Sequence, residues 1–288
     1  MAKRHWRRFL PRKQANAEPS DTGITSLRVV RSVADANAYA QHLKQQEVPT
    51  DAQQKLAYYQ TLLVAQTPQA VLAQWQMDTH KHGYHNREKR LYELIDFNDT
   101  FVNLVLATPL HKRGALPQAL KHKMDMFCRK LGTPCFTSEQ FSAIVLGLGR
   151  EIAVFAAAEQ LGYYARMTSR TQDAFGIDMM IVEPGTNKRL YIDCKTPSAY
   201  RHRLEDLVKY GHISEEQLLQ ADKDDFITID RHHNQDIVPV TLLCIRSDTV
   251  GEVHDFAFDE PRRMQALLDT VFASVENRNI VDIFAKKW

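Results

Sequence analysis

The stretch FGIDMMIVEPGTNKRLYIDCK, residues 175–195, constrains the fold of this chain more than any other. Two short apolar runs, GIDMMIV and RLYIDCK, flank a Pro-Gly turn signal, which is the pattern of a β-hairpin. If the turn is centred directly after Gly185, counting outward along both strands places Asp178 opposite Asp193. The sequence therefore predicts two aspartates side by side, about 5 Å apart at Cβ.

The predicted hairpin has one apolar face and one charged face. Alternate residues of a strand share a face, so Lys195 falls on the side of Asp193. The opposite face is apolar throughout and consists of Ile177, Met179, Ile181, Leu190, Ile192 and Cys194. Like charges directly opposite in a sheet are destabilising, and a divalent cation between the aspartates would remove that cost, because Mg²⁺ takes carboxylate oxygens as ligands. The alternative is an exposed face on which Lys195 pairs with both acids.

A long helix is predicted before the hairpin, in TSEQFSAIVLGLGREIAVFAAAEQLGY. Thr137 and Gln140 have the spacing of a capping box, and Gly162 is typical of a helix end. The apolar stripe of this helix passes through Ile144, Leu148, Phe155 and Ala158. Glu151 falls on the same stripe, and a carboxylate on an apolar face needs a partner, because an unpaired buried charge is strongly disfavoured.

The sequence predicts three parts. Residues 1–24 form a basic flexible tail, with six Lys or Arg in the first 13 positions, that either contacts a phosphate backbone or only solubilises the terminus. Residues 25–134 form a helical domain of four or five helices, and residues 135–288 form an α/β domain. Within the helical domain three histidines suggest a zinc site, but we favour a solvated helix end or a phosphate-contacting loop. They are His80, His82 and His85.

Further elements are expected after the hairpin. Residues 203–222 are predicted to form one or two helices interrupted at Gly211, FITI and IVPVTLLCI two strands, and DEPRRMQALLDTVFASV a helix with Pro261 near its N-terminus. Three cationic side chains closely follow the hairpin and are candidates for phosphate contacts, with simple solvation as the alternative. They are Arg201, Arg203 and Lys209.

Composition sets outer limits on the class of protein. The chain has 288 residues, 44% hydrophobic and 25% charged, and a formal net charge of +2, which neither demands nor repels a polyanion. Four cysteines without CxxC spacing favour free thiols in a reducing compartment, so we expect a cytoplasmic protein. No export signal and no membrane span are predicted.

The order of the helix acid and the hairpin acids along the chain resembles that of the PD-(D/E)xK phosphodiesterase superfamily, the restriction-endonuclease-like nucleases. The resemblance covers about residues 137–250. It rests on Glu151 in the helix, Asp178 at the second strand, and the triplet Asp193-Cys194-Lys195 on the third. It implies an α/β fold with a helix-strand-strand-strand-helix-strand core, preceded here by the all-helical region. Ile177 stands where the family often has proline, and the triplet begins with Asp where Glu is more usual.

The resemblance also implies a site chemistry. Mg²⁺ or Mn²⁺ would be held by Asp178, Asp193 and the backbone carbonyl of Cys194. Lys195 would act beside the attacking water, and Glu151 would be a metal ligand or an acid hydrogen-bonded to one. Glu159, eight residues further along, is a rival for the helix position.

The expected function is therefore that of a Mg²⁺-dependent endonuclease that hydrolyses phosphodiester bonds, with DNA as the expected substrate. The alternative is a catalytically inactive nucleic-acid-binding or regulatory protein that has kept a nuclease-like fold. A thiol enzyme using Cys194 with His202 is disfavoured, because the predicted register turns that thiol into the core. The helical region is a candidate for binding a protein partner, and cutting both strands of a duplex with one active site per chain would call for a homodimer.

Overall fold

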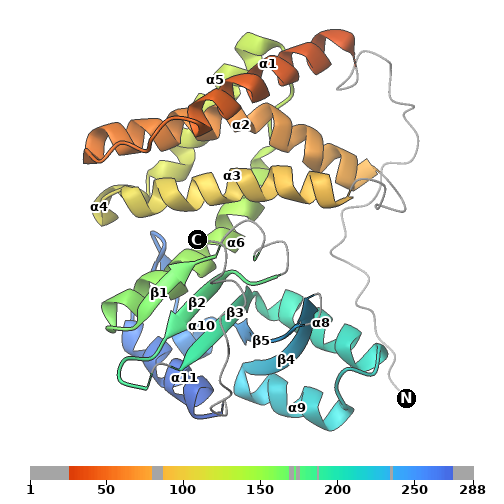
Figure 1. Ribbon diagram of the computed structural model, residues 1–288, viewed down its shortest axis with the longest axis vertical. Coiled ribbons are helices and arrows are strands. Elements are labelled where there is room, and N and C mark those ends of the chain that lie inside the picture. Colours follow the sequence, from red (N-terminus) through yellow and green to blue (C-terminus); the bar gives the residue numbers. More distant parts are fainter. Residues whose placement is uncertain are drawn as a thin grey trace.

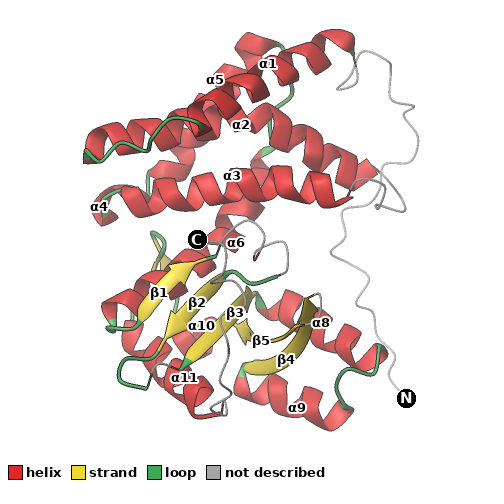
Figure 2. Ribbon diagram, in the orientation of Figure 1, coloured by secondary structure: helices red, strands yellow, loops and turns green. Residues whose placement is uncertain are grey.

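The computed structural model describes residues 26–79, 87–168, 172, 176–186, 188–233 and 236–274 (Figure 1). The predicted basic tail and the three histidines considered as a zinc site lie outside these residues. The described chain is mixed α/β. A layer of helices formed by the N-terminal part stacks on a unit that contains a five-stranded mixed sheet (Figure 2).

Five helices make up the N-terminal layer. They are α1 (Leu27–Lys44), α2 (Ala52–Thr79), α3 (Arg87–Ala107), the single turn α4 (Leu110–Arg113) and α5 (Leu116–Leu131). Gly132 ends α5 in the left-handed conformation, with φ at 70°, and its N–H donates to the carbonyl of Arg129. The prediction of a helical N-terminal region is confirmed.

Helix α6 (Ser138–Gln160) lies between the helical layer and the sheet (Figure 1). The predicted capping box is present: the Thr137 hydroxyl accepts from the N–H of Gln140, and the Gln140 side chain accepts from the N–H of Thr137. Among the described helices only α6 is long and apolar enough to cross a bilayer. Its most apolar window has a mean hydropathy of 1.7, and half of that window is buried within the protein.

The sheet has the strand order β1-β2-β3-β5-β4. Its strands are β1 (Tyr164–Met167), β2 (Met179–Val182), β3 (Arg189–Lys195), β4 (Phe226–His233) and β5 (Asp236–Cys244). Strands β1, β2 and β3 are antiparallel neighbours, whereas β3 and β5 are parallel, and β4 adds an antiparallel edge to β5. Helices α8 (Pro197–Lys209) and α9 (Glu215–Asp224) belong to the connection from β3 to β5, so the predicted break between helices at Gly211 is confirmed.

Helices cover both faces of this sheet. Helix α6 and helix α11 (Pro261–Ser274) pack on one face around Ile192 and Leu243, while α8 and α9 pack on the other face around Leu242. Between β5 and α11 the chain forms the short helix α10 (Ser247–Val250) and a small hairpin of β6 (Val253–His254) and β7 (Ala257–Phe258).

The turn of the small β6–β7 hairpin packs against the helical layer. Asp255 and Phe256 form the turn with φ values of 50° and 66°, a region that side chains larger than glycine rarely adopt. The Phe256 ring is buried against Phe101 of α3, with 5.9 Å between ring centroids, and it belongs to the same apolar cluster as Leu148 of α6. Burial of this ring between two helices offsets the backbone strain.

Candidate active site

The register of the β2–β3 hairpin is the predicted one along most of its length. Met179 pairs with Ile192, and Val182 pairs with Arg189, as counting outward from Gly185 requires. Ile192 is fully buried on the face covered by α6, as predicted for the apolar side of the hairpin.

At the open end of the hairpin the structure departs from the prediction. The N–H of Asp178 donates to the carbonyl of Ile192 at 2.8 Å, although Ile192 already pairs with Met179, so two residues of one strand face a single residue of the other. This is the arrangement of a β-bulge. Ile177 consequently packs with Met180 and Tyr191 on the opposite face from the one predicted. The expected facing pair of Asp178 and Asp193 is not formed.

The bulge gives Asp178 a different set of neighbours. Its carboxylate accepts a hydrogen bond from the backbone N–H of Cys194 at 2.6 Å, which ties it to the middle of the Asp-Cys-Lys triplet. It also lines a pocket of about 210 Å³, shared with Glu151 and Leu148 of α6. The other walls come from α3 and from the end of β1, and consist of Asn98, Asp99, Val102, Asn103, Met167 and Thr168.

Asp193 is bound by two cationic side chains. Only 3% of its side chain is exposed, and one carboxylate oxygen accepts from Arg231 at 2.9 Å, while the other pairs with Lys195. Arg231 also donates to the carbonyl of Gly176 at 3.2 Å, so it links Asp193 to the segment that leads into Asp178. Sequence reasoning missed Arg231. Alternation along β4 places Arg231 on the same face as Ile229, but the sequence does not show that Arg231 meets Asp193.

The two aspartates set the charge state of Lys195. Burial by itself would lower the pKa of its ammonium group, but the negative charges of Asp178 and Asp193 outweigh burial and raise the pKa above its ordinary value. Lys195 is therefore cationic at neutral pH. It can stabilise negative charge or hold a water by donation, and it cannot accept a proton as a general base.

The Cys194 thiol lies in a buried and negatively charged environment. Burial raises the pKa of this thiol well above the usual range, and the negative charges of Asp178, Glu151 and Asp193 raise it further. The thiol faces the core formed with α6 and is only 7% exposed, so it stays protonated. A thiolate nucleophile is not supported at this position.

The remaining predicted residues lie further from this centre. Glu159 is exposed in the last turn of α6 and is not part of the pocket that contains Glu151. On α8, Arg201 is exposed and pairs with Asp222 at 3.3 Å, and the exposed Lys209 lies 5.4 Å from the ring centroid of Tyr210. Arg203, between them, is half-buried.

The donor set matches a hard divalent cation in its chemistry, since carboxylate and carbonyl oxygens are the ligands of Mg²⁺ and Mn²⁺. Glu151 and Asp178 present carboxylates to one pocket. Asp193 does not fit as arranged, because both of its oxygens are bonded to cationic groups. Within the described ranges, no three His, Cys, Asp or Glu side chains are grouped closely enough to hold an ion.

Comparison of the chain with protein-family models, with curated proteins and with solved structures finds no match.

Proposed function

We propose that this protein is a metal-dependent phosphodiesterase that cuts DNA, built on a restriction-endonuclease-like core. The order α6, β1, β2, β3, α8, β5 supports this proposal, with three antiparallel strands followed by a crossover to a strand parallel to β3. Strand β4 and helix α9 are then additions within that crossover. Because a fold alone does not specify an activity, the proposal rests on the residues of the site.

One observation carries the proposal. Glu151 and Asp178 line the same pocket, and the Asp178 carboxylate is bonded to the N–H of Cys194, which lies between Asp193 and Lys195. Helix α6 and the β2–β3 hairpin thus bring two acids and the half-buried Lys195 near one another. Acids and bases concentrated beside a pocket are typical of catalytic sites, because catalysis needs groups whose protonation states are set by their neighbours.

The protein groups have distinct roles in this proposal. Glu151, Asp178 and the carbonyl of Cys194 would hold Mg²⁺ or Mn²⁺, which when bound polarises a phosphoryl oxygen and lowers the pKa of a coordinated water. Lys195, as an ammonium, donates to the scissile phosphate and offsets the extra negative charge that develops there. Asp193 holds the Lys195 ammonium in position through its ion pair.

A plasmid-nicking assay tests this function. Purified protein should convert supercoiled plasmid to nicked or linear DNA in Mg²⁺ or Mn²⁺ and lose this activity in a chelator. Asp178→Asn and Glu151→Gln should each lower the rate by roughly a hundredfold or more while circular dichroism stays unchanged. Glu159→Gln is the matched control, because that acid lies on the same helix, is exposed and does not line the pocket. Full activity in the Asp178 or Glu151 variant would refute the assignment.

The products of plasmid cleavage also report on whether the protein acts as a homodimer. Cleavage of both strands by one active site per chain needs two copies on the duplex. A nuclease acting as a homodimer should give linear plasmid early in the reaction, with a rate that depends on protein concentration, whereas a monomer should accumulate nicked circles first.

A second candidate is a nucleic-acid-binding protein with this fold and no turnover. The observation that favours it is the engagement of both Asp193 oxygens by Arg231 and Lys195, which leaves that acid neutralised without a metal. Titration calorimetry separates the two. Heat of Mn²⁺ binding that disappears in Asp178→Asn supports the nuclease, while DNA binding without any heat of Mn²⁺ binding supports the non-catalytic protein.

A further inference from the structure

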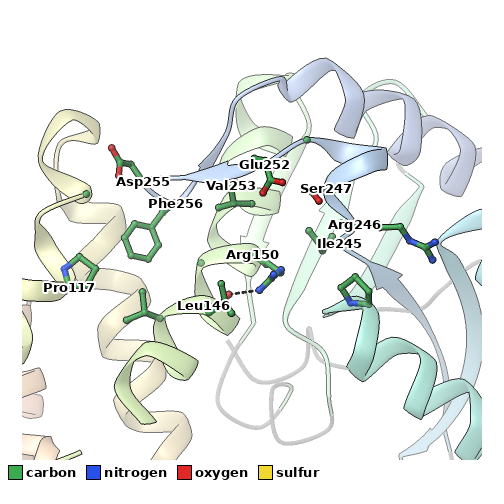
Figure 3. A pocket seen from close by; sticks show the side chains of 15 residues that line it. Pro117, Leu146, Arg150, Ile245, Arg246, Ser247, Glu252, Val253, Asp255 and Phe256 are labelled. Carbon is green, nitrogen blue, oxygen red and sulfur yellow. Dashed lines mark hydrogen bonds between the residues drawn. The ribbon is translucent and has the colours of Figure 1, made fainter. Parts of the chain in front are cut away.

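A second pocket, of about 350 Å³, borders α6 (Figure 3). It lies on the other side of this helix from the pocket that contains Glu151, because the two pockets use different faces of α6. One wall is α6 itself, through Val145, Leu146, Gly149 and Arg150. The opposite side is formed by Pro197 at the start of α8, by the end of β5 and by the β6–β7 hairpin. Open α/β sheets commonly bind ligands outside the carboxyl ends of parallel strands, and this pocket lies at the carboxyl end of β5, beside that of β3.

Arg150 is the cation that faces this pocket (Figure 3). Its guanidinium donates one hydrogen bond, at 3.0 Å, to the carbonyl of Leu146 in the preceding turn. It forms no ion pair with any other part of the described chain. An arginine has five N–H donors in a planar fork, so most of this group is available to an anionic ligand.

The other charged residues of the pocket are placed differently. Arg246 points away from Arg150 and is occupied by Asp222 and Asp225, the latter at 2.7 Å (Figure 3). Glu252 lies across the pocket from Arg150 and opposes any anion bound there, and Asp255 at the β6–β7 turn is a second acid of the lining. The favourable place for an anion is therefore next to α6.

The two pockets are connected through the catalytic elements. Arg150 and Glu151 are adjacent in the same turn of α6, and each lines a different pocket. The carbonyl of Lys195 accepts from the N–H of Ile245, a lining residue of the larger pocket, at 2.9 Å. Both pockets therefore border the end of β3, where the proposed catalytic residues lie.

We infer that the larger pocket receives the phosphodiester backbone of the DNA strand next to the cleaved bond, with Arg150 bound to one of its phosphates. This inference rests on the proposed function and adds to it a substrate-binding residue outside the cluster of acids. The contact positions the strand without reading its sequence, because a phosphate is the same at every nucleotide.

Binding measured without turnover tests the inference. Fluorescence anisotropy with a labelled DNA duplex of about 20 base pairs, in a chelator, gives the affinity and its dependence on salt. Arg150→Ala should weaken binding by roughly tenfold for every sequence and lower the slope of log affinity against log salt by about one. Arg150→Lys keeps the charge and should keep most of that slope. Glu252→Gln should strengthen binding, because it removes the charge that opposes the phosphate.

A matched control and the activity assay separate the possible failures. Arg262→Ala removes an exposed arginine on α11, outside both pockets, and should leave affinity and slope unchanged. If the wild-type protein cuts DNA but Arg150→Ala binds it with unchanged affinity and slope, the inference fails and the proposed function stands. If no variant cuts DNA yet Arg150→Ala lowers the affinity and the slope, the pocket is a phosphate site and the nuclease function fails. Absence of DNA binding by the wild-type protein would overturn both.

Discussion

The bond between Arg231 and Asp193 should contribute a large share of the stability of the sheet unit, and Arg231→Met tests it. Methionine keeps most of the aliphatic length of the side chain and removes the charge and the donors. Arg231 is 16% exposed and Asp193 is 3% exposed, so water can replace the lost bonds only in part. The change also removes the hydrogen bond to the carbonyl of Gly176.

The expected loss follows from these contacts. Removing one partner of a buried ion pair costs about 3–5 kcal/mol when the other charge is left alone. Here Lys195 still pairs with Asp193, which places the cost near the low end, about 3 kcal/mol. Gly176→Ala should act in the same direction, because a Cβ there would lie 2.0 Å from the Arg231 guanidinium, and the backbone φ of 80° disfavours any side chain.

Urea unfolding followed by circular dichroism measures the change in free energy. The exposed Arg262 on α11 offers a control, since Arg262→Met should alter stability by no more than about 0.5 kcal/mol. A double-mutant cycle of Arg231→Met with Asp193→Asn should give a coupling energy of about 1.5 kcal/mol or more. A loss below about 1 kcal/mol in Arg231→Met, the range of an exposed pair, would show that burial does not strengthen this interaction and would refute the reasoning.

The same variant discriminates between the two functions. With Arg231 gone, one oxygen of Asp193 loses its cationic partner and becomes available to an ion. If Asp193 joins Glu151 and Asp178 as a metal ligand once this oxygen is free, Arg231→Met should bind Mn²⁺ more tightly than the wild-type protein, despite its lower stability. A non-catalytic protein should show no heat of Mn²⁺ binding in either.

Two further predictions concern stability alone. Gly147→Ala in α6 meets no atom within 4 Å and should gain about 0.5–1 kcal/mol of helix propensity, which raises the thermal unfolding midpoint. A lower midpoint would contradict the assigned packing. Burial and the hydrogen bond to Asp269, at 2.7 Å, raise the pKa of Tyr163. The contribution of Tyr163 to the free energy of unfolding is therefore fully present below about pH 10 and is lost as pH rises beyond that. Urea unfolding at about pH 8 and about pH 11 should show a smaller loss of stability at the higher pH in Tyr163→Phe than in the wild-type protein.

The features that could be predicted from the sequence depend on local interactions. The capping box at Thr137, the ends of the helices and the alternation along β2 and β3 all depend on residues a few positions apart, whose geometry is fixed by the backbone. The hairpin register belongs to this class as well, because a short turn centred after Gly185 fixes every pair that follows it.

Long-range packing decided the rest of the candidate site. The bulge at Asp178 turned that acid from Asp193 toward Glu151, and strand alternation alone gives no sign of one extra residue. Arg231 on β4 reaches across β5 to Asp193 on β3. The pattern of strands along the sequence does not specify this strand order. The sequence thus determined which segments are strands and which residues carry charge. Only the tertiary structure decided which charges meet, because that choice depends on contacts between segments far apart in the chain.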